Sequence, residues 1–133
     1  MPAKILIVDD NADVRIALSA VLRHAFVVLE APDGEKALAL IAKEKPRLVL
    51  LDVSMPGLGG LEVLARARAH DPSLLVLMLT SRQDVDLAVR ALTLGAAEYV
   101  TKPFDADYIR AEVENLLRPP SKSAGDPPWR HAP

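Results

Sequence analysis

The sequence KILIVDDN, residues 4–11, indicates a buried strand and raises the first question about function. Four β-prone apolar residues, 5–8, run directly into Asp9 and Asp10. A continuous apolar run is typical of a strand covered on both faces, as in a parallel sheet. Two adjacent carboxylates at the end of such a strand are unfavourable, since like charges repel and burial disfavours the charged form. What makes them tolerable depends on the residues that the fold brings to the same place.

Four further apolar runs follow along the chain, at residues 26–29, 48–51, 74–79 and 99–100. The segments between them place apolar residues at helical spacing. Three apolar helix faces are expected: Val14, Leu18, Val21 and Leu22; Val85, Ala88, Val89 and Leu92; and Ile109, Val113, Leu116 and Leu117. Asp33-Gly34 should start the second helix, and Gly95 suits a left-handed helix C-cap. Five strand–helix repeats predict a three-layer α/β sandwich with right-handed crossovers, a five-stranded parallel sheet and five helices.

The composition excludes several functional classes. The chain has 133 residues, half of them apolar, and a formal net charge of −2, which argues against direct nucleic-acid binding by this domain. It has no cysteine, which excludes disulfides and thiolate metal sites and favours a reducing cytoplasm. No apolar run approaches a membrane span, and the first is too short for a signal peptide. We therefore expect a soluble, cytoplasmic protein without a membrane partner.

The composition changes at Pro119. Residues 119–133, PPSKSAGDPPWRHAP, are rich in Pro, Ser and Gly, with little to bury, and predict a disordered tail or linker after a domain at residues 1–118. Trp129 is the only tryptophan. An idle terminus or a cut linker is favoured there over an anchor for a partner. Whether an effector domain follows in the full-length protein stays open.

Polar residues follow four of the five expected strands. Asp9 and Asp10 follow the first strand, Asp52 the third, Thr80 the fourth and Lys102 the fifth. Each alone would be read as a helix cap, a turn residue or a surface charge. Ligands of parallel α/β sheets bind outside the carboxyl ends of the strands, so we expect these five side chains to meet at one edge. Three carboxylates, a hydroxyl and a lysine at one edge indicate a functional site.

The residue types indicate phosphoryl transfer. Clustered carboxylates need a cation, and hard oxygen ligands suit Mg²⁺, with Mn²⁺ as an alternative. Lys102 can hold a phosphoryl oxygen, and Thr80 supplies a hydroxyl donor. Phosphoryl transfer depends on positioning and charge neutralisation, which such a set provides. A spare carboxylate can also act as the nucleophile and form an aspartyl phosphate.

The motifs resemble those of the receiver domain of bacterial two-component response regulators. They are VDD at residues 8–10, LLDVSMPGLGGLEVL at 50–64, LTS at 79–81 and GAAEYVTKPF at 95–104, within a resemblance that spans roughly residues 4–118. The resemblance implies the flavodoxin-like receiver fold, with strand order 2-1-3-4-5. It implies a phosphorylation-dependent signalling switch, either a single-domain chemotaxis-type regulator or the N-terminal receiver of a larger one. Such a domain catalyses only its own phosphorylation and dephosphorylation.

The resemblance also implies roles for individual residues. Asp52 would accept a phosphoryl group from a sensor histidine kinase or a phosphotransfer protein. Asp10 would bind Mg²⁺ directly and Asp9 largely through a metal-bound water, with Asp52 and the main-chain carbonyl of Ser54 completing the protein's ligands. Lys102 would pair with the phosphoryl group and precede a cis peptide bond to proline.

The same resemblance implies a switch. Thr80 would move to the phosphoryl group and Tyr99 would swing inward, changing the face formed by the fourth helix, the fifth strand and the fifth helix. This face would control an output partner or domain. For its static role, Tyr99 is equally well read as a strand aromatic that packs in the core.

Some positions depart from the family's usual pattern or have a simpler interpretation. Ser54 and Arg82 occupy positions that tune the phosphate lifetime in the family, and their joint effect stays open. Glu112 and Glu114 stand where winged-helix regulators usually carry arginines for dimer salt bridges. The resemblance therefore implies a monomer or a weak phosphorylation-dependent dimer. The third helix carries three basic residues that are interpreted as a solvated face: Arg66, Arg68 and His70.

Two alternatives compete with the switch. A phosphatase of the haloacid dehalogenase type also uses a Mg²⁺-assisted aspartate, but in an Asp-x-Asp pattern after the first strand, whereas Asp9 and Asp10 are adjacent here. An interaction module that has lost phosphorylation is the other, and the intact five-residue set speaks against it.

Overall fold

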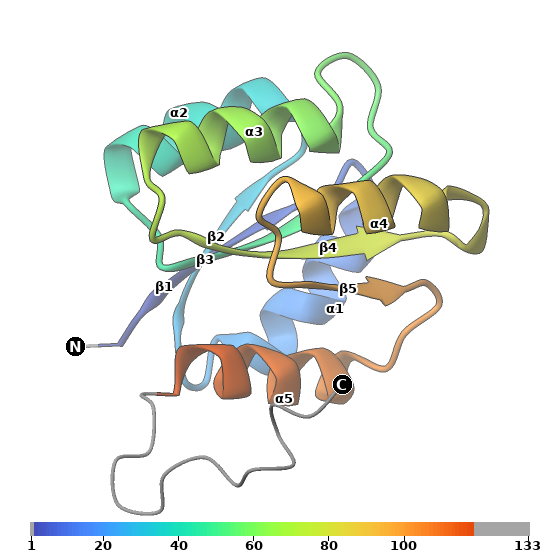
Figure 1. Ribbon diagram of the computed structural model, residues 1–133. Coiled ribbons are helices and arrows are strands. Elements are labelled where there is room, and N and C mark those ends of the chain that lie inside the picture. Colours follow the sequence, from blue (N-terminus) through green and yellow to red (C-terminus); the bar gives the residue numbers. More distant parts are fainter. Residues whose placement is uncertain (1, 119–133) are drawn as a thin grey trace, which may run out of the picture.

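The computed structural model, which describes residues 2–118, contains a five-stranded parallel sheet with helices on both faces (Figure 1). The strands are β1 (Lys4–Val8), β2 (Val27–Ala31), β3 (Leu48–Asp52), β4 (Leu75–Thr80) and β5 (Glu98–Thr101). The helices are α1 (Ala12–Leu22), α2 (Gly34–Glu44), α3 (Gly60–His70), α4 (Val85–Thr93) and α5 (Ala106–Leu117), with a short 3₁₀ turn η1 (Arg82–Asp84). The three-layer α/β fold is confirmed. The expectation of a tail at 119–133 lies outside the described residues.

The strand order is β2-β1-β3-β4-β5, as the resemblance implied. The chain leaves β1 towards β2 on one side of the sheet, then crosses back to β3 on the other. Neighbouring connections diverge between the carboxyl ends of β1 and β3, and such a point is where open α/β sheets bind ligands. Asp9 directly follows β1, and Asp52 is the last residue of β3.

Two apolar cores lie on the two faces of the sheet. Helices α2, α3 and α4 cover one face, and α1 and α5 cover the other (Figure 1). Alternate residues of the buried strands face opposite sides. Leu6 and Val8 thus belong to the first core, whereas Ile5 and Ile7 belong to the second. Burial on both faces explains why the strands appear as continuous apolar runs.

Short polar side chains start three of the helices. Asn11, Asp33 and Asp105 cap α1, α2 and α5, each accepting a hydrogen bond from a main-chain N–H of the first turn. The predicted start of the second helix at Asp33-Gly34 is therefore confirmed. Gly95 follows α4 with a φ of 105°, a left-handed conformation that glycine adopts without strain.

The expected apolar face of α4 was partly wrong. Ala88 and Ala91 are fully buried against the sheet, whereas Val89 is 47% and Leu92 40% exposed. The small alanine side chains make up the contact stripe, so the larger apolar residues are displaced to its margin. The larger apolar side chains of α4 therefore did not mark the face that is buried against the sheet.

Arg68 was also misread as part of a solvated face. Its side chain is partly buried and its Nη1 donates to the main-chain oxygens of Pro72 and, at 2.8 Å, Leu74. It packs beside Gly95, where a Cβ atom would lie only 2.8 Å from the Arg68 Nε. Arg68 thus supports the turn after α3. Among residues 2–118, no helix has the length and apolar character needed to cross a membrane.

Candidate functional site

Asp9 is fully buried at the end of β1, and all four of its polar groups have partners. Its Oδ1 accepts from the N–H of Asn11 at 2.9 Å, and its Oδ2 accepts from the Lys102 ammonium at 2.8 Å. Its main-chain N–H donates to the Ala31 oxygen at 3.2 Å, and its main-chain oxygen accepts from Arg15 at 2.7 Å. Both the backbone and the side chain of Asp9 are therefore held in place at this edge of the sheet. The next residue, Asp10, is exposed.

Asp52 lies beside Asp9 and is almost as buried, with 6% of its surface exposed. Its Oδ1 accepts a hydrogen bond from the Ser54 N–H at 3.1 Å. Burial, and next the negative charge of Asp9, raise the pKa of Asp52 to about 6, although Lys102 and the Ser54 N–H act in the opposite direction. For Asp52, burial and the charge of Asp9 therefore outweigh the stabilisation that Lys102 and the Ser54 N–H give to its charged form.

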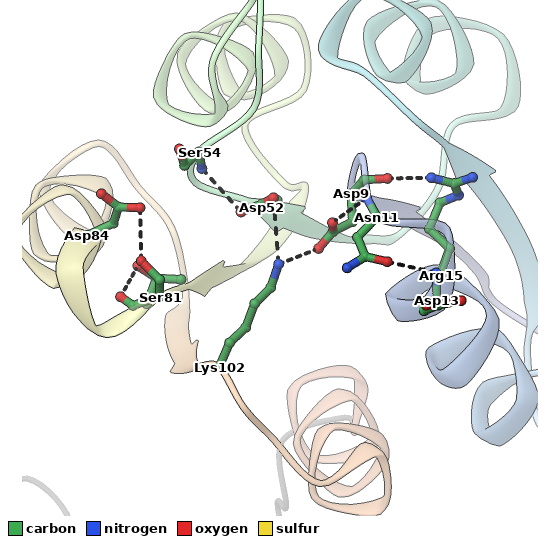
Figure 2. Close-up of polar contacts among 10 residues, drawn as sticks. Asp9, Asn11, Asp13, Arg15, Asp52, Ser54, Ser81, Asp84 and Lys102 are labelled. Atoms are coloured by element: carbon green, nitrogen blue, oxygen red, sulfur yellow. Dashed lines mark hydrogen bonds and ion pairs between the residues drawn. The ribbon is translucent and has the colours of Figure 1, made fainter.

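Lys102 reaches the cluster from the end of β5 (Figure 2). Its Nζ lies 2.8 Å from Oδ2 of Asp9 and 3.6 Å from Oδ2 of Asp52. Its main-chain N–H donates to the Thr80 oxygen at 2.6 Å, and its peptide bond to Pro103 is cis, as expected. The register of β4 and β5 thus brings the lysine side chain to the acids.

Asp9, Asp10 and Asp52 form a group that suits a divalent cation. One carboxylate oxygen from each residue can be chosen so that the three lie within 4.8 Å of one another. Carboxylate oxygens are the hard ligands preferred by Mg²⁺ and Mn²⁺. Burial, and next the charge of Asp9, raise the pKa of Asp52, and a bound divalent cation would favour its charged form. The residues therefore fit the ion that the sequence predicted.

The remaining predicted site residues are less directly engaged. Thr80 is fully buried at the end of β4, and its hydroxyl donates to the main-chain oxygen of Ser81 at 3.0 Å rather than to Asp52. Tyr99 is partly buried and packs against the core on the α4 side of the sheet. Ser54 is exposed on the loop after β3, and its N–H contacts Asp52. Asp9, Asp10, Asp52 and Lys102 are thus brought together, while the Thr80 hydroxyl and the Tyr99 side chain make no hydrogen bond to them.

Three residues beside the site were not predicted from the sequence to contact it: Arg15, Glu30 and Gly60. Arg15 holds the Asp9 carbonyl, and its Nε lies 3.3 Å from Oε1 of Glu30, near the end of β2, where nothing chemical was expected. Gly60 packs so closely that a Cβ there would overlap the Asp52 main-chain oxygen. The only signal in the sequence for the contact between Arg15 and Asp9 was the position of Arg15, four residues after the N-cap Asn11. Residues four apart lie on the same face of a helix, so Arg15 faces the same way as the cap at the end of β1.

The architecture and site agree with a comparison against known families. The response regulator receiver domain family matches residues 5–114. The chain belongs to this family. Receiver membership favours a signalling domain over the phosphatase of the haloacid dehalogenase type, and its relatives are named as regulators and a phosphotransferase.

Relatives of this receiver domain include both short and long proteins. Sporulation initiation phosphotransferase F of Bacillus subtilis is 40% identical, covering 88% of this chain and 95% of the relative. Response regulator MprA of Mycolicibacterium vanbaalenii is 42% identical, covering 95% of this chain and 56% of the relative. The chain thus spans nearly all of the first relative and about half of the second.

Solved receiver domains share the fold. The receiver domain of NtrX from Brucella abortus has a TM-score of 0.80 and 35% identity, with 85% of this chain and 97% of that chain covered. The DrrB receiver domain, described as BeF3 activated, has a TM-score of 0.81 and 31% identity, covering 88% of this chain and 98% of that one.

Proposed function

We propose that this protein is a phosphorylation-controlled signalling switch whose phosphoacceptor is Asp52, within a receiver domain at residues 1–118. The observation that carries the proposal is the meeting of the Lys102 ammonium with the buried carboxylates of Asp9 and Asp52, at 2.8 and 3.6 Å. A sensor histidine kinase or a phosphotransfer protein would supply the phosphoryl group. The domain acts on itself and turns over no diffusing substrate.

The acidic group would hold Mg²⁺, or Mn²⁺ in its place. Asp10 and Asp52 would bind the ion directly, Asp9 largely through water, and the main-chain carbonyl of Ser54 would complete the protein's ligands. The oxygens available within 4.8 Å of one another support this assignment. When bound, the ion supplies positive charge that offsets the charge developing on the transferred phosphoryl group.

The residues of the chain divide the reaction between them. A carboxylate oxygen of Asp52 attacks the phosphorus of a phosphohistidine, so that an O–P bond forms while the N–P bond breaks and the imidazole leaves. Lys102 would hold a phosphoryl oxygen and limit the charge on it. Burial of Asp52, of whose surface 6% is exposed, limits the access of water to the nucleophile. Lys102 and the loop carrying Ser54 therefore hold the reacting groups in position, and neither forms a bond to phosphorus.

The switch would begin at Thr80. Its hydroxyl now contacts the Ser81 carbonyl, and it would exchange this contact for a phosphoryl oxygen. Tyr99, on the neighbouring β5, would move inward and change the face made by α4, β5 and α5. Val89 and Leu92 are exposed on α4, which supports this face as the surface for an output partner. Glu112 makes a symmetric dimer through the same face less favourable, so we assign a monomer or a weak phosphorylation-dependent dimer.

Labelling with acetyl phosphate and MgCl₂ tests the proposal. Intact mass spectrometry should show one added phosphoryl group on the wild type and none on Asp52→Asn. The matched control is Asp86→Asn, which changes an exposed acid of α4 and should label like the wild type. Equal labelling of Asp52→Asn and the wild type would contradict the assignment. Failure to bind Mg²⁺ would instead favour an interaction module that has lost phosphorylation.

A further inference from the structure

Arg15 joins three parts of the fold beside the acidic cluster. It lies in α1, its Nη1 donates to the main-chain oxygen of Asp9 at 2.7 Å, and its Nε lies 3.3 Å from Oε1 of Glu30 in β2 (Figure 2 shows the first contact). The Arg15 side chain is only 18% exposed, whereas that of Glu30 is 39% exposed, so the contact with Asp9 is the more sheltered of the two. Arginine suits this place because its planar fork can direct different nitrogens to two acceptors at once.

The contacts of Arg15 close a ring around the turn that carries the acids. The Asp9 N–H donates to the oxygen of Ala31, and Ala31 is the chain neighbour of Glu30. The N–H of Asp9 is thus bonded directly to the end of β2, and its carbonyl oxygen is linked to the same strand end through Arg15 and Glu30. The ring leaves the Asp9 backbone little freedom to rotate.

The held carbonyl determines where Asp10 begins. The oxygen of Asp9 and the nitrogen of Asp10 belong to one planar peptide unit, so a contact that fixes the oxygen also fixes the bond leading to Asp10. Asp10 itself is exposed, and no hydrogen bond fixes its side chain among the described residues. The orientation of this peptide is therefore the main restraint on its carboxylate.

Glu30 gives the arrangement its electrostatic balance. An isolated guanidinium beside three carboxylates would compete with a divalent cation for the same negative charge. The carboxylate of Glu30, 3.3 Å from the Arg15 Nε, offsets the charge of Arg15. The pair can therefore hold the peptide while adding no net charge near the ion.

We propose that Arg15 is a positioning residue that, with its charge balanced by Glu30, orients the Asp9–Asp10 peptide so that Asp10 can bind Mg²⁺. This inference rests on the proposed function, because the Mg²⁺ site is part of it. It assigns a purpose to two residues that touch neither the ion nor the phosphoryl group.

Calorimetric titration of the full chain with MgCl₂ provides the test. A positioning role and a purely electrostatic role of Arg15 predict opposite changes in the dissociation constant for Mg²⁺ when Arg15 is replaced. Arg15→Gln should raise the dissociation constant for Mg²⁺ about tenfold, as is typical when a residue supporting a metal ligand is lost. If Arg15 acted only through its charge, the same variant would bind Mg²⁺ more tightly. Arg15→Lys keeps the charge but lacks the fork, so its constant should fall between those of Arg15→Gln and the wild type.

Two further variants complete the set. Glu30→Gln leaves the guanidinium uncompensated and should also weaken Mg²⁺ binding, and the double variant should bind no more weakly than Arg15→Gln alone. Arg23→Gln is the matched control. It removes another α1-proximal arginine whose Nη2 donates to the Ser19 hydroxyl at 2.8 Å, at the opposite end of the helix, and should leave the constant unchanged.

A metal-free measurement separates positioning from loss of structure. In ¹H–¹⁵N spectra without divalent ions, Arg15→Gln should shift the amide signals of Asp10 and Asn11, while its thermal unfolding stays cooperative. An unchanged or lower Mg²⁺ constant in the folded Arg15→Gln or Arg15→Lys variant would overturn this inference alone. A wild type that binds no Mg²⁺ would overturn both this inference and the proposed metal site.

Discussion

The ammonium of Lys102 makes its shorter contact, 2.8 Å, with the carboxylate of Asp9, although the two residues are 93 positions apart in the chain. Asp9 is fully buried, so this contact supplies a countercharge to a carboxylate that solvent cannot stabilise. Lys102 therefore has a structural role that is independent of the proposed phosphorylation.

That role predicts a loss of stability in Lys102→Met. In urea denaturation without divalent ions, the free energy of unfolding should fall by about 2 kcal/mol, since one buried charge loses its partner while the lysine itself is partly solvated. The matched control is Lys4→Met, which removes a more exposed pair with Glu44 and should change stability by less than about 1 kcal/mol. Equal losses in the two variants would contradict the structural role of Lys102.

Mg²⁺ should stabilise the folded chain. Binding to the native state alone raises the free energy of unfolding by about 1.4 to 2.7 kcal/mol at 10 to 100 times the dissociation constant. Thermal unfolding with MgCl₂, compared with KCl at equal ionic strength, measures the effect. Asp10→Asn should lose it, whereas Asp13→Asn, an exposed acid in the first turn of α1, should keep it. A rise in melting temperature in Asp10→Asn as large as that of the wild type would place the ion elsewhere.

Glu98 should make stability depend on pH. Burial and the adjacent carboxyl of Glu112 raise the pKa of Glu98 from 4.5 to about 7, and its Oε1 is buried without a hydrogen bond among the described residues. The folded state thus holds this proton more tightly than the unfolded state. Stability from this group is therefore greatest below the unfolded pKa, falls as pH rises from 4.5 to about 7, and is constant above.

Glu98→Gln should remove this dependence. The variant should melt at a higher temperature than the wild type when the pH is well above the raised pKa, and the difference should shrink as the pH falls toward the ordinary carboxyl value. Glu114→Gln, an exposed acid of α5, is the control and should follow the wild type. Parallel melting curves for Glu98→Gln and the wild type at all pH values would show that Glu98 does not contribute.

Gly60→Ala should destabilise the loop after β3. The added methyl would overlap the Asp52 main-chain oxygen and lie 2.8 Å from the Val53 Cα, so the backbone would have to shift. We expect a loss of about 2 kcal/mol, the usual size for overpacking. Gly59→Ala is a close control, because no atom lies within 4 Å of its Cβ and its φ of −75° suits alanine. Denaturation curves that coincide for the two variants would contradict the close packing.

The sequence was sufficient for the fold and for much of the site because both depend on where strands end. Apolar runs located the five strands, and parallel pairing then brought Asp9, Asp52 and Lys102 to one edge. Side-chain directions were beyond this reasoning. The Thr80 hydroxyl contacts the Ser81 carbonyl, a local alternative that only the rotamer reveals.

The remaining errors have a common physical origin. On α4, close approach of the helix to the sheet buries alanines and leaves Val89 and Leu92 exposed, which hydrophobicity alone does not predict. Arg68 and Arg15 act through long side chains that reach main-chain oxygens of other segments. Long, charged residues have too many accessible conformations for spacing in the sequence to fix their partners.

The ring through Arg15 and Glu30 has a mechanical consequence. β2 is an outermost strand of the sheet, yet its end is coupled through two side chains to the peptide before Asp10. A molecule that binds this outer strand and displaces Glu30 would release the Asp9–Asp10 peptide and thereby weaken Mg²⁺ binding at the proposed site without contacting a proposed ligand of the ion. The strand farthest from β5 would thus offer a second place from which the proposed site is controlled.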